Sequence, residues 1–375
     1  MVAVVAISVA ACSEQRSSAP GERESSTAEG RWTLAPAPPK TVAGFQGLSA
    51  FAVAGEVAVI AEVDYEQATV KIITYDPEDQ DWAGGADSEI WWRSGSATVS
   101  TDDEVILHGG CCGPAGSGSR APGFAYDVQR DRWREIAAGP LGDRFGHAAV
   151  WTGRQAIFWG GFGASRWSDG AAYEPKADTW DRIATGPLGP RRDHVAVWTG
   201  EEMIIWGGSN RSLSRSYRGG AAYDVDADRW RPITQAPIPP QIGPELEADA
   251  TDAVWTGREM LIWNGAEGAA YEPIEDSWRR IPHRPLPPGD PGGTDSAVWT
   301  GEELIVWGGV RRGVDFLATG AAYDPDTDRW QLLPESPLEG RDRHAAAWTG
   351  DAMLIWGGCC HGSRYFSDGA FFVPK

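Results

Sequence analysis

Residues 144–180 read RFGHAAVWTGRQAIFWGGFGASRWSDGAAYEPKADTW. Apolar segments rich in Val, Ile, Trp, Tyr and Ala occupy 147–151, 156–159 and 170–173, and a fourth segment contains Trp180. The first three are closed by Thr-Gly, by Gly-Gly and by Glu-Pro-Lys-Ala-Asp. Short runs of this composition, bounded by Gly, Pro or Asp, are typical of β-strands between turns. The stretch therefore predicts four short strands connected as a meander.

The same pattern recurs along the chain with a period near 50 residues. Six tryptophans each follow a tyrosine by seven positions, and these pairs are Tyr75/Trp82, Tyr126/Trp133, Tyr173/Trp180, Tyr223/Trp230, Tyr271/Trp278 and Tyr323/Trp330. A four-stranded unit cannot bury both of its faces alone. Repeats of this length must therefore stack as blades around an axis.

Seven second-strand segments can be counted, and they are centred near Val59, Ile106, Ile157, Ile204, Leu261, Ile305 and Leu354. The last repeat has no tryptophan strand of its own, whereas Gly30–Leu34 matches one. We predict an all-β, seven-bladed propeller over residues 31–375 whose last blade is completed by the strand around Trp32. The predicted blades are 43–82, 83–133, 134–180, 181–230, 231–278, 279–330, and 331–375 with 31–34.

The repeats carry a recognisable motif of Pro-x-x-x-Arg-x-x-His, Gly-Gly, Tyr and Trp. Three copies begin Pro140/Arg144/His147, Pro187/Arg191/His194 and Pro337/Arg341/His344. The motif resembles that of the kelch-repeat β-propellers, which implies the fold above. Repeats five and six depart from this motif, because they have Thr251 and Asp295 at the position where the others have His. The repeat-register tryptophans are expected to pack in the core.

The N-terminus has the features of an export signal. Residues 1–11 are small and apolar, which fits a signal peptide, and Val9-Ala10-Ala11-Cys12 resembles the cleavage site of bacterial lipoproteins. No Lys or Arg precedes the apolar run, which a start codon placed too far downstream would explain. A plain secreted protein is the alternative to a lipoprotein. Residues 13–30 are expected to be a flexible tether. We expect an extracytoplasmic protein attached to a membrane only by lipid on Cys12.

The other four cysteines form two adjacent pairs, Cys111/Cys112 and Cys359/Cys360. In an oxidising compartment they are disulfide candidates, either within each pair or between the two loops. A thiolate metal site with His108 or His361 is the alternative. The sequence predicts no resident cofactor.

The net charge of −20 hides an uneven distribution. In a meander, turns after the first and third strands lie on one side of the disc, and these turns are acidic; Asp-Pro turn chemistry accounts for many of the acids. The connections on the other side are long and rich in arginine. Such loops are favoured binding positions, and arginine suits carboxylate, sulfate or phosphate groups. The predicted binding residues are Arg166, Trp167, Arg211, Arg215, Tyr217, Arg218, Arg311, Arg312, Arg364 and Tyr365.

We therefore expect a monomeric binding module for an acidic glycan or a protein partner, and the acidic composition argues against nucleic acid. Arg144, Arg191 and Arg341 are expected to brace the repeat instead. The alternative is an enzyme acting on sugars. Resemblance to galactose oxidase-like propellers implies copper held by Tyr and His, for which His108, His361, Tyr217, Tyr365 and Cys111 or Cys360 are available. Resemblance to sialic-acid mutarotases implies acid/base groups near an arginine.

Overall fold

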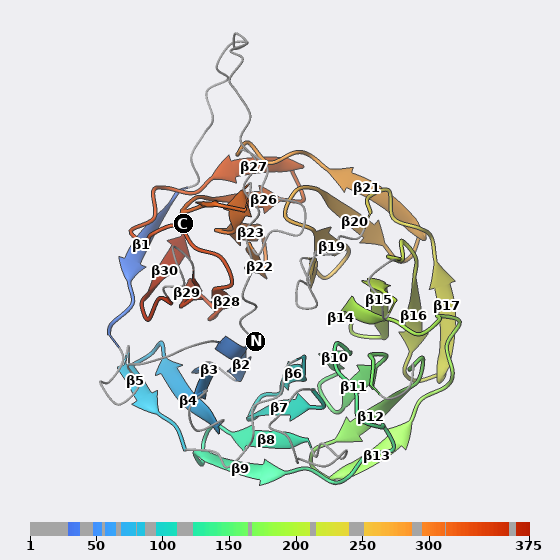
Figure 1. Ribbon diagram of the computed structural model, residues 1–375. Coiled ribbons are helices and arrows are strands. Elements are labelled where there is room, and N and C mark those ends of the chain that lie inside the picture. Colours follow the sequence, from blue (N-terminus) through green and yellow to red (C-terminus); the bar gives the residue numbers. More distant parts are fainter. Residues whose placement is uncertain are drawn as a thin grey trace.

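The computed structural model describes residues 29–37, 48–54, 57–64, 69–79, 81–86, 95–110, 123–163, 167–210, 215–239, 251–286, 295–311, 313–359 and 365–375. These residues form strands and no helix. Seven four-stranded antiparallel sheets are arranged as the blades of a β-propeller (Figure 1). The predicted fold class is confirmed.

Each blade is a meander that runs from the central axis to the rim. Blades 1 to 3 comprise β2 (Leu48–Ala54), β3 (Val57–Asp64), β4 (Thr69–Asp76) and β5 (Asp81–Gly84); β6 (Ala97–Ser100), β7 (Glu104–His108), β8 (Phe124–Asp127) and β9 (Arg132–Glu135); and β10 (Ala148–Trp151), β11 (Ala156–Trp159), β12 (Gly170–Glu174) and β13 (Thr179–Arg182). Blades 4 and 5 comprise β14 (Arg192–Trp198), β15 (Glu202–Ser209), β16 (Gly220–Asp224) and β17 (Arg229–Ile233); and β18 (Asp252–Trp255), β19 (Met260–Trp263), β20 (Gly268–Glu272) and β21 (Ser277–Ile281).

Blade 6 contains β22 (Ser296–Trp299), β23 (Leu304–Trp307), β26 (Gly320–Asp324) and β27 (Arg329–Leu332), with a small hairpin of β24 (Val310–Arg311) and β25 (Asp315–Phe316). Blade 7 contains β28 (Ala345–Trp348), β29 (Met353–Trp356), β30 (Gly369–Pro374) and β1 (Gly30–Leu34). Strand β1 pairs with β30 and sets Trp32 opposite Phe372, as predicted. The innermost strands contact one another around the whole ring, including β28 with β2.

The tyrosine and tryptophan pairs tie each blade to the one before it. In blade 3, the Tyr173 hydroxyl donates to Asp178, and the same carboxylate oxygen accepts the backbone N–H of Ala137 from the connection out of blade 2. The Trp180 indole donates to the Ala137 carbonyl. Asp178 is in the left-handed backbone conformation, with φ of 53°, which closes the turn. The spacing that defines the repeat is therefore the spacing of an interblade connection.

The core lies between blades and is built from aromatic and branched side chains. Trp159 of β11, for example, packs with Met203 and Tyr223 of blade 4. The second-strand tryptophans are almost wholly buried, as predicted, and they are Trp159, Trp206, Trp263, Trp307 and Trp356. At two interfaces, the glycine that follows the second-strand tryptophan is required because a side chain there would clash with the next blade. A Cβ on Gly308 would lie 2.5 Å from the His344 ring of the next blade.

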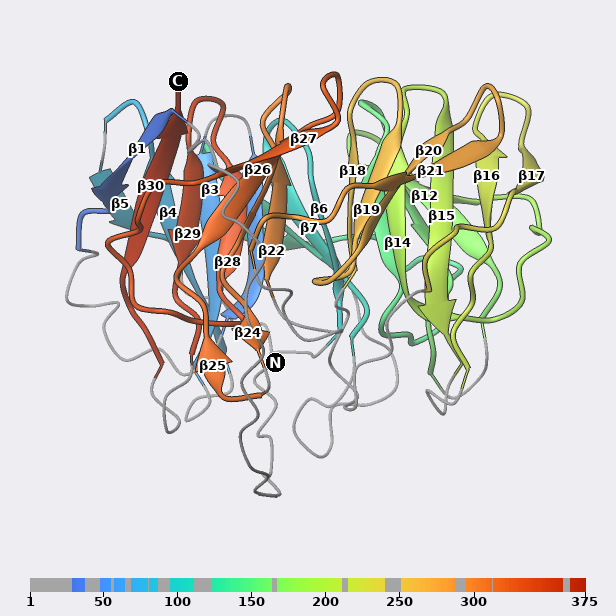
Figure 2. The same cartoon turned by 90° about the horizontal axis from the view of Figure 1, so that it is seen from above.

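The disc has two distinct faces, seen from the side in Figure 2. The hairpin face carries the turns between first and second strands and between third and fourth strands. The loop face carries the connections between second and third strands and those from blade to blade, together with β24 and β25. A search of the described segments for a helix able to cross a membrane finds none.

Candidate functional site

Three arginines on the loop face are buried and bind backbone carbonyls of their own blade. The Nη1 atoms of Arg144, Arg191 and Arg341 donate to the first glycine of each Gly-Gly pair, at 2.9, 2.9 and 3.0 Å. Each guanidinium also bonds the carbonyl two residues before it. The expected bracing role is thus observed, although the partners are not the neighbouring histidines. They are backbone carbonyls and, for Arg144 and Arg341, the carboxylates of Asp169 and Asp368.

An aromatic side chain from the following loop covers each of these guanidinium groups. Trp167 lies over Arg144 at 4.9 Å, Tyr217 over Arg191 at 4.5 Å, and Phe366 over Arg341 at 4.1 Å from ring centroid to Cζ. Trp167 and Tyr217, predicted to contact a ligand, therefore also complete the blade. The sequence offers the reason in hindsight, since one aromatic follows each Gly-Gly pair at a similar distance.

Arg215 and Arg218 stand apart from the bracing arginines because their side chains are exposed. The guanidinium of Arg215 also lies over the blade-4 aromatic, 5.4 Å from the Tyr217 ring centroid. Neither Arg215 nor Arg218 forms an ion pair with a described carboxylate. Arg311, in contrast, is paired with Asp315 across the small hairpin.

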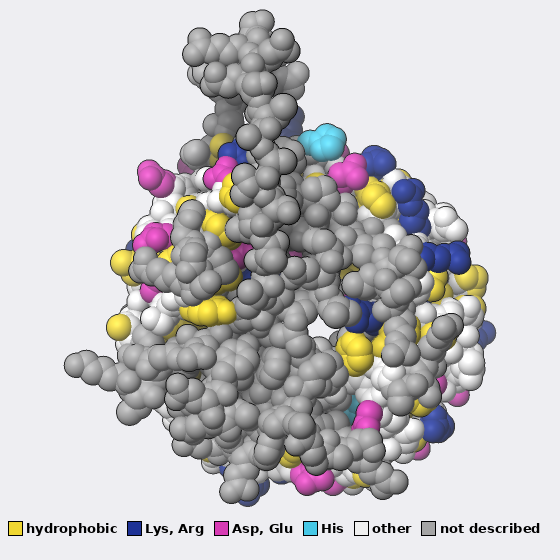
Figure 3. Space-filling model, in the orientation of Figure 1, with side chains coloured by type: hydrophobic (Ala, Val, Ile, Leu, Met, Phe, Trp, Pro, Cys, Tyr) yellow, Lys and Arg dark blue, Asp and Glu magenta, His cyan; other side chains and the backbone are white. Residues whose placement is uncertain are grey.

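The loop face is viewed in Figure 3, where lysine and arginine side chains that are not covered by grey atoms lie mainly over the blade 4 and blade 5 side. Tyr365, the remaining described candidate, lies in blade 7, where its backbone forms an isolated antiparallel β-bridge with that of Cys359. The other predicted binding residues lie outside the described residues, and they are Arg166, Arg211, Arg312 and Arg364.

A group that the sequence did not predict as a site lies between blades 5 and 6. Asp252 begins β18 and Asp295 precedes β22, and both enter from the loop face. Asp295 Oδ2 accepts the Trp263 indole N–H at 3.0 Å and the Arg284 Nη1 at 3.1 Å. Arg284 is only 6% exposed, and its Nε and Nη2 have no hydrogen-bond partner in the part of the chain that the structure describes. The only sequence signal was the departure from histidine at Asp295.

The two carboxyl groups differ in the contacts that oppose their protonation. Burial raises the pKa of Asp252 to about 8, with a further contribution from the negative charge of Asp295. Burial also raises the pKa of Asp295, but Arg284 and the Trp263 indole oppose that shift by stabilising the carboxylate. Asp252 is therefore a neutral acid at pH 7, beside an aspartate whose carboxyl group is held by Arg284 and the Trp263 indole.

Histidines occupy the equivalent place at three other interfaces, where they are His147, His194 and His344. His194 packs edge-on against Trp159, and His344 packs edge-on against Trp307. Burial lowers the pKa of both histidines to about 3, so they are neutral packing groups. At these interfaces, the sequence signal of a Pro-x-x-x-Arg-x-x-His motif marks structure.

The described members of the predicted metal sets do not come together. His108 Nδ1 lies 3.0 Å from His147 Nε2, a hydrogen bond between neutral rings in blades 2 and 3. Tyr217 and Tyr365 belong to blades 4 and 7. Among the described residues, no three His, Cys, Asp or Glu side chains are grouped to hold a metal ion.

Cys359 is buried, and its Sγ lies 3.3 Å from Asp342 Oδ1. It is disulfide-bonded, but the cysteine that pairs with it lies outside the described residues. Cys111, Cys112, Cys360 and His361 lie there too, as does Cys12. The pairing of the cysteines stays a prediction.

On the hairpin face, arginines are paired with glutamates of the same blade. Arg134 binds Glu104, Arg231 binds Glu202, and Arg279 binds Glu259. Each of these arginines also reaches a tyrosine hydroxyl of the next blade. These pairs neutralise part of the acidic face and link neighbouring blades.

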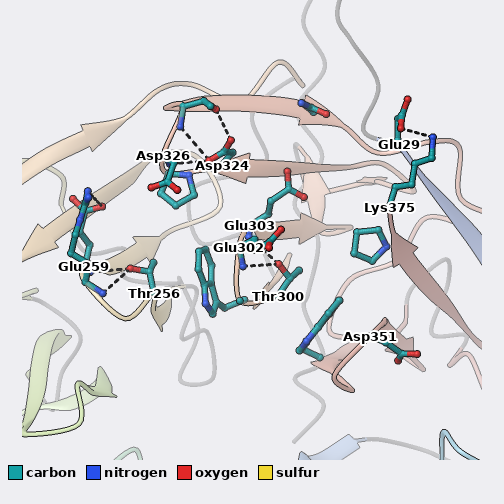
Figure 4. Close-up of a pocket in the computed structure, with 18 residues that line it drawn as sticks. Glu29, Thr256, Glu259, Thr300, Glu302, Glu303, Asp324, Asp326, Asp351 and Lys375 are labelled. Carbon is teal, nitrogen blue, oxygen red and sulfur yellow. Dashed lines mark hydrogen bonds and ion pairs between the residues drawn. The ribbon is translucent and has the colours of Figure 1, made fainter.

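Blade 6 departs from this arrangement, because Gln331 takes the place of the arginine. Glu303, which corresponds to the paired glutamates, lines a cavity of about 1200 Å³ between the turns of blades 5, 6 and 7 (Figure 4). Burial raises the pKa of Glu303, and the charges of Asp324 and Glu302 raise it further. Trp299 and Trp348 contribute apolar walls. The cavity is thus negatively charged and open to cations.

Comparison with known proteins gives the fold. No family model matches the chain, and no curated protein matches it in sequence. Among solved structures, the chain is similar to YjhT, with a TM-score of 0.53 and 16% identity over 74% of this chain and 93% of that one.

The chain is also similar to a fungal alcohol oxidase of the AA5 family solved in complex with copper. The TM-score is 0.65, with 14% identity over 92% of this chain and 76% of that one. Both likenesses show the propeller fold and agree with the kelch-repeat resemblance of the sequence. At this identity they do not transfer a function.

Proposed function

We propose that the protein is a binding module that captures an anionic ligand, an acidic glycan or an acidic protein segment, on its loop face. The observation that carries the proposal is the state of the arginines. The hairpin-face arginines described above are neutralised by glutamates, whereas Arg215 and Arg218 are exposed and have no carboxylate partner among the described residues. Exposed guanidinium groups can accept a ligand carboxylate or sulfate without first breaking an ion pair.

The neighbouring contacts support a preorganised surface. The Tyr217 ring contacts the guanidinium groups of both Arg191 and Arg215, so it lies next to exposed charge. A rigid ring beside two cations offers both stacking and ion pairing to a sugar acid or an acidic peptide. The predicted loop residues Arg166, Arg211, Arg312 and Arg364 would add to this surface.

Binding of heparin oligosaccharide and of poly-L-glutamate tests the proposal. The double substitution Arg215→Ala with Arg218→Ala is expected to weaken binding about tenfold and to reduce its salt dependence. The matched control is Arg154→Ala with Arg229→Ala, which removes the same charge from exposed arginines on the hairpin face. Equal weakening by both pairs would mean that only net charge matters, and no selective effect of the first pair would remove the proposal.

We also propose that the module works outside the cytoplasm, held to a membrane by lipid on Cys12. The support is the lipoprotein-like sequence before residue 13. Substitution of Cys12 by Ser should release the protein from membranes of an expressing bacterium, measured by fractionation. Membrane attachment that survives this change would contradict the proposed anchor.

Enzymatic action on a sugar is the second candidate, and the observation that favours it is the unequal carboxyl pair beside Arg284. Two acids whose environments separate their pKa values can serve as acid and base. The copper-dependent form of this alternative would draw on residues that do not meet among the described ones. Metal analysis of the purified chain separates these forms, since stoichiometric copper would favour the oxidase form.

A further inference from the structure

The interface between blades 5 and 6 has an arrangement of charge that the other described interfaces lack. Where His194 and His344 pack neutrally against a tryptophan, this interface places Asp295 against Trp263. Asp252 adds a second carboxyl group from the facing blade, where strand register sets it opposite Trp263, the residue whose indole donates to Asp295. An acid in place of a neutral packing residue breaks the pattern of the repeat at this one position. Such breaks are typical of functional positions.

The charges around the pair can be enumerated from each packed element. From blade 6 come the Asp295 carboxylate and the backbone N–H of Ala297, which reaches Asp252. From the connection into blade 6 comes Arg284, whose Nη1 binds Asp295. From blade 5 comes the indole of Trp263. Among the described residues, one cation therefore faces two carboxyl groups, and the ion pair that it forms is with Asp295.

Arg284 is itself incompletely satisfied. Its Nε and Nη2 are buried without a partner, and leaving charged donors in this state is costly. A movement that brought the Asp252 carboxylate to these donors would relieve the cost. In the observed arrangement the guanidinium faces Asp295 alone, so a single negative charge is balanced.

We propose that Asp252, Asp295 and Arg284 form a proton-binding site between blades 5 and 6, in which the two carboxyl groups carry one negative charge between them. Uptake of a proton by Asp252 balances the site and favours the packed interface. Loss of that proton places a second carboxylate beside the first and weakens the interface.

The direction of the pH effect follows from linkage. Asp252 has a pKa of about 8 in the folded chain, against 3.8 as the ordinary value. The folded state therefore holds a proton that the unfolded state has released between these values. The stabilisation is fully present below about pH 4 and is lost as the pH rises through 8.

The test is urea unfolding of the full chain between pH 6.5 and 9, where the titration of the unfolded histidines is the same in the wild type and the variants. The unfolding constant of the wild type is expected to rise by about tenfold per pH unit up to pH 8 from this group. Asp252→Asn, which keeps shape and removes the titration, should lose this rise and be the more stable form at pH 9. The control Asp226→Asn removes an exposed carboxylate and should follow the wild type. A D252N slope equal to that of the control would overturn the proposal.

Two further measurements keep the test decisive if D252N folds poorly. Asp252→Ser removes the same carboxyl group, and unfolding at pH 7.5 should release about one proton fewer than in the wild type, read with a pH indicator. Asp295→Asn removes the competing carboxylate, so Asp252 should pair with Arg284 and its titration should move to lower pH. An unchanged midpoint in D295N would show that the two carboxyl groups do not act together.

A consequence for binding rests on the proposed function. Ionisation of Asp252 adds a negative charge at the loop-face end of β18, so poly-L-glutamate should bind the wild type more weakly at pH 9 than at pH 7. The unfolding measurements need no ligand. A failure of the binding proposal would therefore leave the proton site standing, and the reverse also holds.

Discussion

The two faces of the disc differ in how their arginines are held. On the hairpin face, Arg134, Arg231 and Arg279 each lie against a glutamate of their own blade. On the loop face, the bracing arginines are buried against carbonyl groups, and two of them also pair with an aspartate. Arg215 and Arg218, in contrast, are exposed and have no carboxylate partner among the described residues. Net charge alone therefore says little about which face can hold an anion. What matters is whether each charge already has a partner.

The faces also differ in how closely neighbouring blades approach. On the loop face, a glycine of one blade lies against the histidine of the next, as Gly308 does with His344. On the hairpin face, the turn glycines have open space around them. The loop face is thus a tightly packed platform that can hold binding side chains in place, and the hairpin face is joined more by ion pairs.

The largest effect should come from removing a buried loop-face arginine. Arg341→Ala is expected to destabilise the chain by about 3 to 5 kcal/mol, because several carbonyl groups lose a charged donor and Phe366 loses its packing surface. Urea unfolding measures it. Arg329→Ala, on the exposed hairpin face, should change stability by less than about 0.5 kcal/mol. Similar effects of both changes would remove the distinction between the faces.

A glycine pair gives a smaller effect with a close control. Gly308 and Gly301 both have positive φ, of 77° and 102°, so alanine is strained at either position. Only at Gly308 would the new Cβ meet another blade. Gly308→Ala should therefore cost about 2 kcal/mol more than Gly301→Ala in thermal or urea unfolding. Equal costs would mean that backbone strain, and not interblade contact, requires the glycine.

The smallest effect is expected for a hairpin-face ion pair. Arg231 is 37% exposed on its side chain and Glu202 is 20% exposed, so solvent screens their attraction. A double-mutant cycle with Arg231→Ala and Glu202→Gln should give a coupling of about 1 kcal/mol that falls in high salt. A coupling as large as the loss in Arg341→Ala would show that the hairpin-face ion pairs hold the blades as firmly as the buried loop-face arginines do.

Much of the fold could be predicted because the repeat encodes interblade contacts. Asp178 and Trp180 bond to the connection out of the preceding blade, and the Tyr173 hydroxyl accepts a hydrogen bond from Arg134 of that blade. Their fixed spacing made both the period and the blade count readable. The strand around Trp32 was predictable for the same reason, since it matches the outer strand of the other blades.

The candidate sites were less predictable because they depend on which residues face each other. Trp167 and Tyr217 looked available for a ligand in the sequence, yet they cover Arg144 and Arg191. Asp252 gave no signal, because its partner Asp295 lies on the next blade and the pair exists only once the blades pack. Arginines on both faces looked alike in the sequence until their partners were known.

The most direct test of the central claim is arginine modification by phenylglyoxal in the presence and absence of poly-L-glutamate, read by peptide mass spectrometry. We predict that the ligand protects Arg215 and Arg218 on the loop face and leaves Arg154 and Arg229 on the hairpin face as reactive as before. Protection of the hairpin-face arginines, with Arg215 and Arg218 unchanged, would contradict the account.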